Sequence, residues 1–390
     1  METPARIPVT HVGSLPRPPE LVALIASAER GDAVDAAALE QAIDTAVRDA
    51  VRRQATGGID IVSDGEQGRP SYATYIKDRL TGFSGSSPPL AGADLEEFPR
   101  FYAAFRARRA GSMRLARPCC TGEVRRRDGT PLARELGRLR AALDAQGLAH
   151  GFVNAASPGV VTVFHENRHY ASRDAYLADV ADAMRDEYRA VIAAGFDLQV
   201  DCPDLAMGRH LAFKSASEGE FLAHACRQVE ALNAALAGLP GERVRLHLCW
   251  GNYEGPHHRD IPLDAIFEVV MRVKARILLF EAANPRHAHE WRVFAERRHE
   301  IPDDMVLAPG LVSPTSAYIE HPELVAERLQ RFADIVGRDR VVAVADCGFA
   351  PFAGDAQADA DLCYAKLAAL AEGARLASRR LFGEIGRAHV

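Results

Sequence analysis

Short apolar runs with the composition of β-strands alternate along this chain with longer stretches whose apolar residues recur every three or four positions. This alternation is typical of a parallel α/β sheet or barrel, because parallel strands need a long crossover that is usually a helix. The chain contains eight such runs, the number that a closed (βα)8 barrel requires. The expected strands are residues 9–13, 59–63, 151–155, 197–201, 244–249, 276–281, 305–309 and 341–345.

The clearest helical periodicity lies in four stretches between these strands, residues 37–57, 172–194, 218–236 and 322–336. Residues 82–130 lack this rhythm, are rich in Gly, Ser, Pro and Arg, and end in a hairpin-type turn signal, Asp128-Gly129. We therefore predict an α/β fold in which residues 1–390 form a single (βα)8 TIM barrel domain. The insertion at about 82–130 is expected to be an antiparallel excursion between strands two and three.

The expected strand 244–249 carries an imidazole and a thiol two positions apart, at His247 and Cys249. Side chains at i and i+2 of a strand point to the same face, so one strand can supply two ligands of one zinc ion. The alternative is ordinary core packing, since unpaired cysteines are among the most buried residues.

Two further strand ends can complete the ligand set, because one expected strand ends in Glu281 and another is followed by Cys347. Two thiolates and a carboxylate around Zn²⁺ leave one net negative charge, which makes the ion a poor activator of water and a better partner for a thiol substrate. Glu281 is the weakest donor, so we expect the substrate sulfur to displace it. The alternative is a structural zinc, for which a closed four-ligand site is usual.

Other polar residues follow the first two expected strands. A turn at Gly13 and Ser14 has backbone amides that can hold a carboxylate or sulfonate, or it is an ordinary strand-to-loop turn. Asp64 and Glu66 can take a substrate ammonium, or simply pair with Arg69. Their place at strand ends, where barrel enzymes keep their active sites, favours a functional role.

The fourth expected strand ends in a buried carboxylate, Asp201, which needs a substrate amine or a neighbouring Arg as its partner. Histidines lie in the loops after the fifth and sixth strands, and each can transfer a proton or be an ordinary surface residue. These histidines are His257, His258, His287 and His289.

Composition excludes several classes of protein. A net charge of −6 argues against nucleic-acid binding, and no apolar run is long enough to cross a bilayer. The N-terminal residues lack the apolar centre of a signal peptide, and seven cysteines without regular spacing do not form a disulfide framework. We therefore expect a cytoplasmic protein without nucleic-acid or membrane partners, and a homo-oligomer is compatible with the sequence.

Over nearly its whole length the chain resembles the C-terminal catalytic barrel of cobalamin-independent methionine synthases. The motifs that carry the resemblance are His11-Val-Gly-Ser-Leu-Pro16, Asp64-Gly-Glu66, Gln199-Val-Asp-Cys-Pro203, His247-Leu-Cys249, Phe280-Glu281 and Asp346-Cys-Gly-Phe349.

The resemblance implies a (βα)8 barrel, Zn²⁺ as cofactor, and transfer of an alkyl group to a thiolate bound to the zinc. Its partners would be a small thiol and an alkyl donor such as methyl-folate or methyl-corrinoid. Carried over by position, the zinc ligands would be His247, Cys249, Glu281 and Cys347.

The resemblance also implies a site for the acceptor thiol. Gly13 and Ser14 would hold its carboxylate, and Glu66 and Asp201 would hold its amine. Asp201, Glu66, His257 and His258 are then the predicted catalytic residues outside the ligand set.

Several positions depart from the methionine synthase pattern. We expect only one barrel, Cys202 stands where the family has a second carboxylate, and Thr315 replaces a proton-handling histidine. The polar loop 250–258 is more similar to single-barrel relatives, which include epoxyalkane:coenzyme M transferases. The sequence therefore supports methyl or alkyl transfer to homocysteine or a similar thiol, with thiol addition or carbon–sulfur cleavage, or a non-catalytic barrel with a structural zinc, as alternatives.

Overall fold

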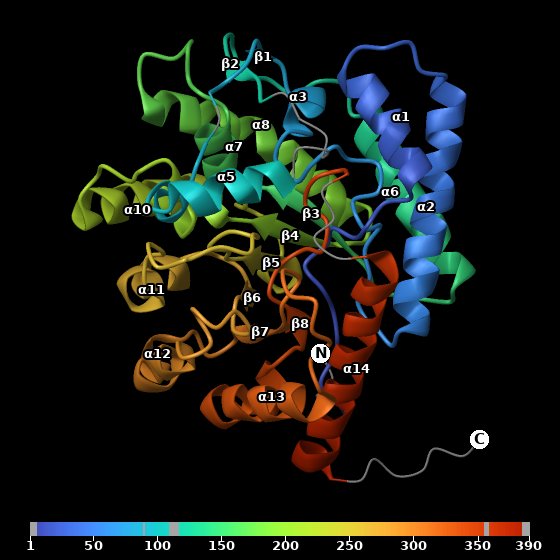
Figure 1. Ribbon diagram of the computed structural model, residues 1–390, viewed down its shortest axis with the longest axis vertical. Helices are drawn as coiled ribbons and strands as arrows, with labels where there is room; N and C mark the ends of the chain where they lie inside the picture. Colours follow the sequence, from blue (N-terminus) through green and yellow to red (C-terminus); the bar gives the residue numbers. More distant parts are fainter. Residues whose placement is uncertain (1–5, 89, 109–116, 355–358, 384–390) are drawn as a thin grey trace.

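In the computed structural model, which describes residues 6–88, 90–108, 117–354 and 359–383, a curled six-stranded parallel sheet forms the centre of the molecule (Figure 1). Its strands are adjacent in the order in which they occur along the chain. The strands are β3 (Phe152–Ala156), β4 (Asp197–Asp201), β5 (Val244–His247), β6 (Ile277–Phe280), β7 (Val306–Val312) and β8 (Val344–Ala345). These six elements match six of the expected strands, although β5 ends at His247, two residues earlier than expected.

Helices connect successive strands and cover the outside of the sheet (Figure 1). The crossovers contain α7 (Pro158–Phe164), α8 (Arg173–Ala193), α10 (Glu218–Ala235), α11 (Leu263–Met271), α12 (Trp291–Glu296) and α13 (Pro322–Val336). Sequence explains where the long ones begin, since Ser172 caps α8 and Ser217 forms a capping box with Glu220 at the start of α10. Their apolar faces pack on strands that are buried almost throughout.

The first two expected strands appear as single parallel bridges. Thr10 pairs with Ile61, and Val62 pairs with Gly151, directly before β3. Val9 pairs with Ala343, directly before β8, so these segments contact both edges of the six-stranded sheet.

The other helices lie before β3, beside the sheet or at the chain end. They are α1 (Pro19–Glu29), α2 (Ala36–Thr56), α3 (Ile76–Arg79), α4 (Ala93–Glu96), α5 (Pro99–Arg108), α6 (Thr130–Ala145), α9 (Gly208–Leu211) and α14 (Ala360–Phe382). Four short 3-10 turns are η1 (Pro203–Leu205), η2 (Gly241–Arg243), η3 (Arg298–Glu300) and η4 (Arg338–Arg340). None of the helices in the described ranges combines the length and hydrophobicity of a bilayer-spanning segment.

The segment expected as an insertion contains a short antiparallel pair of strands, β1 (Phe83–Ser84) and β2 (Cys119–Cys120). The same segment supplies α4 and α5, which border the cavity described below. Part of the segment, residues 109–116, lies outside the described residues.

Candidate metal centre and substrate cavity

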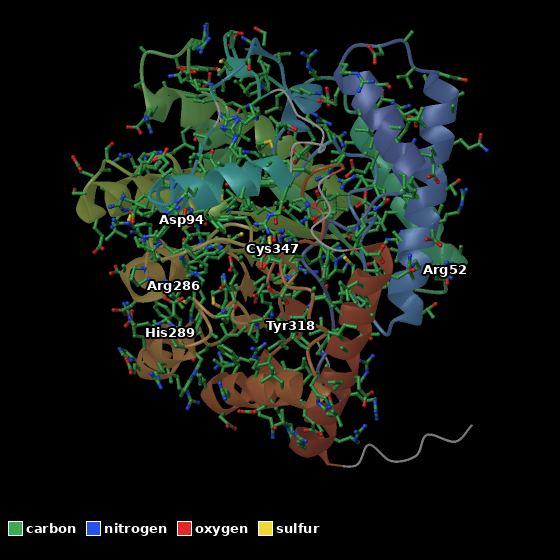
Figure 2. All side chains as sticks on the ribbon, viewed as in Figure 1. Arg52, Asp94, Arg286, His289, Tyr318 and Cys347 are labelled. Atoms are coloured by element: carbon green, nitrogen blue, oxygen red, sulfur yellow. The ribbon has the colours of Figure 1, made fainter. Side chains whose placement is uncertain are left out.

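Two sulfur atoms and one imidazole come together where β5 and β8 end. His247 is the last residue of β5, Cys249 follows two positions later, and Cys347 follows β8 by two positions. The sulfur atoms of the two cysteines are 3.7 Å apart, and all three candidate ligand atoms lie within 4.8 Å of one another. Among the described residues this is the one group of three or more such side chains that is close enough to share an ion. Figure 2 shows Cys347 near the middle of the molecule.

The surroundings of His247 fit a metal ligand. Its Nδ1 atom lies 3.0 Å from Oδ1 of Asp201, and its buried Nε2 atom has no hydrogen-bond partner in the described chain. A carboxylate on one ring nitrogen orients the imidazole and leaves the other nitrogen for a metal. Amides of Gln199 and Asn154 each donate a hydrogen bond of 3.0 Å to Asp201, which keeps that carboxylate in place. Two thiols and this imidazole make a donor set that suits zinc.

The charges of the three groups support one another. The hydrogen bond between Cys347 and Cys249 lowers the pKa of the Cys347 thiol to about 6, although burial acts in the opposite direction, and His247 contributes to the lowering. Burial opposes protonation of His247, but its hydrogen bond to Asp201 and the nearby Cys347 raise its pKa to about 10. Cys347 is therefore a thiolate at neutral pH, the form of cysteine that binds metals.

Glu281 directly follows β6 but is not in the three-residue group. Its Oε1 accepts a hydrogen bond of 2.8 Å from the backbone N–H of Trp250, and its Oε2 accepts one of 2.9 Å from Asn284. Asp346 supports the same turn by accepting hydrogen bonds from three successive backbone amides, Ala282, Ala283 and Asn284. Glu281 therefore stays a predicted fourth ligand.

A cavity of about 650 Å³ opens beside the three ligands. The polar residues of its lining include Ser14, Glu66, Asn154, Asp201 and Asn252. The apolar and aromatic residues of its lining include Tyr72, Leu95, Tyr102, Phe105, Phe164 and Phe352. The cavity therefore offers polar groups to a small thiol and apolar surface to a second molecule.

Comparison with known proteins identifies the family. The sequence model of the family described as "Cobalamin-independent synthase, Catalytic domain" matches residues 7–88 and 111–369, most of the chain. The chain belongs to the cobalamin-independent synthase family.

Similar proteins carry two kinds of name. A 2-hydroxypropyl-CoM lyase of Xanthobacter autotrophicus is 26% identical over 371 residues, covering 88% of this chain and 89% of the relative. A methionine synthase of Thermococcus kodakarensis is 24% identical, covering 98% and 97% of the two chains. The solved structure of a B12-independent methionine synthase from a Shewanella species matches with a TM-score of 0.70 at 19% identity, over 96% of this chain and 99% of that one, so it shows a shared fold.

In this member of the cobalamin-independent synthase family, three of the predicted substrate-binding residues, Ser14, Glu66 and Asp201, line the cavity, and Gly13 directly precedes Ser14. Gly13 has a φ of 137°, and a Cβ atom there would lie 2.3 Å from Oδ1 of Asn154, so only glycine fits beside the amide that holds Asp201. Ser14 and Glu66 both line the cavity. Asp64 lies next to them, where its Oδ1 accepts a hydrogen bond of 2.9 Å from the backbone N–H of Glu66.

Glu66 is held in an unusual state. Its backbone has a φ of 55°, its side chain is buried, and its Oε2 atom has no partner among the described residues. Burial raises the pKa of Glu66 to about 8, against the lowering effect of Arg69, and Asp201 raises it further. A carboxyl group with an unpaired oxygen in a cavity is suited to receive a cation.

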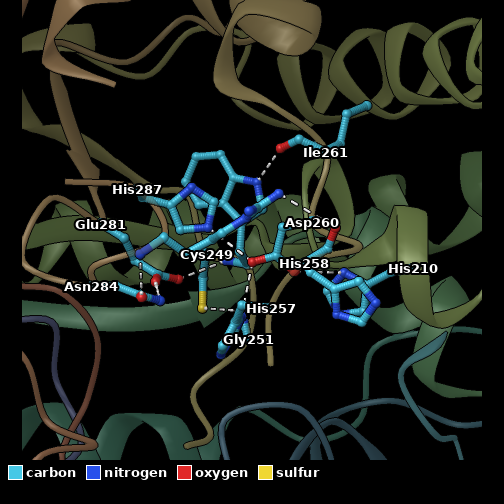
Figure 3. A network of polar contacts seen from close by, with 12 residues as sticks. His210, Cys249, Gly251, His257, His258, Asp260, Ile261, Glu281, Asn284 and His287 are labelled. Carbon is cyan, nitrogen blue, oxygen red and sulfur yellow. Dashed lines mark hydrogen bonds and ion pairs between the residues drawn. The ribbon is translucent and has the colours of Figure 1, made fainter. Parts of the chain in front are cut away.

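The predicted proton-transfer histidines lie away from the ligands. His257 is buried, and its Nδ1 atom lies 2.8 Å from Oδ2 of Asp260 (Figure 3). Its Nε2 atom lies 2.9 Å from the backbone oxygen of Tyr253. His258 pairs with Glu97 at 2.8 Å at the surface, and His289 is exposed. Neither His257 nor His258 lines the cavity, so the structure does not bring these two predictions together with the ligands.

His287 and Thr315 both have polar partners. His287 is buried between Asp260 and Glu290, at 2.9 Å and 2.8 Å. The Oγ1 atom of Thr315 lies 3.0 Å from Oγ of Ser313, in a small hollow that both share with Cys347. The histidine that does line the cavity besides His247 is His210, on α9, which has no periodic or motif signal in the sequence.

Proposed function

We propose that this protein is a zinc-dependent alkyltransferase that moves a methyl group to a small thiol such as homocysteine. The observation that carries the proposal is the Cys249–Cys347–His247 group at strand ends, open to a cavity, in a chain of the cobalamin-independent synthase family. The names of its methionine synthase relatives support the methyl transfer.

His247, Cys249 and Cys347 would hold the ion, and Glu281 would be the fourth ligand that the substrate sulfur displaces. A bound zinc would supply one thing, the binding of the substrate thiol as a thiolate. Asp201 fixes the ring of His247, and the apolar residues of the cavity lining exclude water from the reacting atoms.

The polar residues of the cavity lining favour an amino-acid thiol. Both oxygens of Asp201 already accept hydrogen bonds, so the unpaired carboxyl oxygen that remains for a substrate ammonium belongs to Glu66. Backbone amides at Gly13 and Ser14 would take the substrate carboxylate, and the Gly13 amide would then give up its hydrogen bond of 3.2 Å to Nδ1 of His11. Homocysteine carries both groups, whereas a sulfonate thiol without an amine leaves Glu66 unpaired.

Two wider expectations belong to the same proposal. We infer that the bridged segments at Thr10 and Val62 complete an eight-stranded barrel, because they pair with both edges of the sheet. The enzyme would act in the cytoplasm, where thiols stay reduced.

A second reaction deserves a test because the 2-hydroxypropyl-CoM lyase relative matches over most of both chains. In that reaction the same thiolate would add to, or be released from, a different small carbon substrate. Thr315, in place of the expected histidine, is compatible with this change.

The decisive experiment loads the purified protein with zinc and incubates it with homocysteine or coenzyme M, each with methyl-folate, methyl-corrinoid or epoxypropane. Methionine from homocysteine and a methyl donor supports the proposal. A coenzyme M thioether formed from epoxypropane, without any methionine, supports the second reaction. Protein that binds no zinc when prepared without chelators contradicts both.

A further inference from the structure

A buried group of histidines and carboxylates lies beside the cavity, around Asp260 (Figure 3). The Oδ2 atom of Asp260 accepts hydrogen bonds from Nδ1 of His257 at 2.8 Å and from Nε2 of His287 at 2.9 Å. Its Oδ1 atom lies 3.2 Å from Nδ1 of His210. Side chains of Asp260 and His210 are each only 1% exposed.

Two of these histidines have both ring nitrogens occupied by acceptors. His257 faces Asp260 on one side and the backbone oxygen of Tyr253 on the other. His287 lies between Asp260 and Glu290. A ring with an acceptor at each nitrogen is held as imidazolium, so neither side chain is free to exchange a proton with a substrate.

His210 differs from both. Neither of its ring nitrogens has a hydrogen-bond partner among the described residues. Burial lowers the pKa of His210, while Asp260 and Asp94 raise it. The ring is therefore a neutral imidazole that is able to take up one proton beside a carboxylate.

The position of His210 gives that proton a route. Its side chain lines the cavity beside the ligands. It also lines a second hollow on the protein surface, together with Arg209, Lys214, His258 and Arg259. Among the described residues, the histidines that line the cavity are His210 and the predicted ligand His247. The ring of His210 therefore borders both the cavity and this surface hollow.

We propose that His210 is the general acid of the reaction, taking a proton from the outer hollow and giving it to the atom that loses the alkyl group. This inference rests on the proposed function. In the overall reaction the S–H bond of the thiol breaks and its proton leaves when the thiolate forms. A carbon–sulfur bond forms, the bond from carbon to the donor atom breaks, and the donor atom keeps that electron pair and gains the proton from His210.

The groups that face His210 set its proton affinity. Asp260 lies on the loop after β5, Asp94 on α4, His257 on the same loop as Asp260, and Glu281 after β6. Asp260 acts as a positioning residue, because His257 and His287 fix its orientation and Asp260 in turn faces His210. Glu66 is the competing proton donor in the cavity, but an ammonium bound to it would keep it ionised.

The test compares two methyl donors that differ in the leaving atom. An amine leaving group, as in 5-methyltetrahydrofolate, must be protonated, whereas iodide from methyl iodide needs no proton. With zinc and homocysteine present, His210→Gln should slow transfer from the folate at least about 100-fold and leave the KM for homocysteine and the rate with methyl iodide within about twofold. The matched control is His224→Gln, which removes a buried histidine packed on Phe213, outside the cavity.

Equal losses with both donors, or no loss with the folate, overturn the proposal for His210 and leave the proposed function standing. A wild-type enzyme that methylates no thiol with either donor overturns the proposed function and this inference with it. A second measurement does not depend on turnover. The ring signals of His210, assigned by their loss in His210→Gln, should titrate in the wild-type protein at a lower pH than those of an ordinary histidine, because burial lowers the pKa of His210, and a ring with one protonation state throughout overturns the proposal.

Discussion

The sulfur atoms of Cys249 and Cys347 lie 3.7 Å apart, although the two residues are 98 positions apart in the sequence. Parallel strands β5 and β8 bring them together, because both cysteines follow the carboxyl end of a strand. At this distance two thiolates repel each other unless a cation lies between them, so the two thiols do not both lose their protons readily. The pKa of Cys347 is therefore lowered, whereas Cys347 and burial together raise the pKa of Cys249 well above its ordinary value.

Replacing one of these thiols should remove the metal. We expect Cys249→Ser to lower zinc affinity by at least about 100-fold and to abolish transfer, because it removes a direct ligand. Zinc per chain, measured by mass spectrometry after dialysis, checks the prediction. Cys226→Ser is the control, since Cys226 is half-buried on α10, away from the cavity; equal zinc in both variants would contradict the assignment.

Asp201, which is hydrogen-bonded to His247, should strengthen metal binding without being a ligand itself. Asp201→Asn keeps the size of the side chain but loses the charge that orients the imidazole 3.0 Å away. We expect zinc affinity to fall about 10- to 100-fold, as for other carboxylate partners of ligand histidines. Competition with a chelating dye measures the change, and an affinity equal to that of the wild type would show that Asp201 has no part in holding the ring.

Stability should depend on pH through Glu66. Burial raises its pKa from 4.5 to about 8, so the folded protein favours the neutral carboxyl group. That contribution is complete below about pH 4.5 and is lost as the pH rises through about 8. Across this pH window, denaturant unfolding should show that the free energy of unfolding of the wild type falls by on the order of a few kcal/mol relative to that of Glu66→Gln. The other buried carboxyl groups are common to both proteins, so parallel curves would contradict the raised pKa of Glu66.

Gly13 should not tolerate a larger residue, because the side chain of Asn154 lies against it. Gly13→Ala adds a methyl group 2.3 Å from Asn154 in a backbone conformation with a φ of 137°. Gly31→Ala is the matched control, since its φ is 79° and nothing lies within 4 Å of the added Cβ. Backbone strain alone should lower the free energy of unfolding of each variant by about 1 kcal/mol or more. We expect a larger loss for Gly13→Ala than for Gly31→Ala, and a loss of zinc affinity only for Gly13→Ala. Equal effects would show that Asn154 moves away without consequence.

Local patterns in the sequence predicted most of the central sheet. Residues 197–201 were expected as a strand and form β4, and the sites of β3 and β5 to β8 agree within a few residues. Apolar runs buried on both faces leave a clear signal. The runs at residues 9–13 and 59–63 were also expected as strands, but the structure has isolated bridges there, such as the one between Thr10 and Ile61.

The candidate site was predictable where it lies at strand ends and unpredictable where it depends on packing. His247, Cys249 and Cys347 follow from strand periodicity and chain topology. His210 lies on a four-residue helix, α9, and its role depends on contacts with Asp260, 50 positions away in the numbering. The sequence pattern indicated histidines after β5 and β6, whereas His210 lies between β4 and β5 and was not singled out.

The backbone at Glu66 has a consequence for directed evolution. A left-handed φ of 55° and a buried, unpaired carboxyl group both work against folding at this one position. Glycine or asparagine adopts such a backbone more readily, and neither brings a charge. Libraries selected only for heat resistance should therefore replace Glu66 early, whereas libraries selected for turnover should keep it, so the residue found at position 66 would record which selection the population has passed.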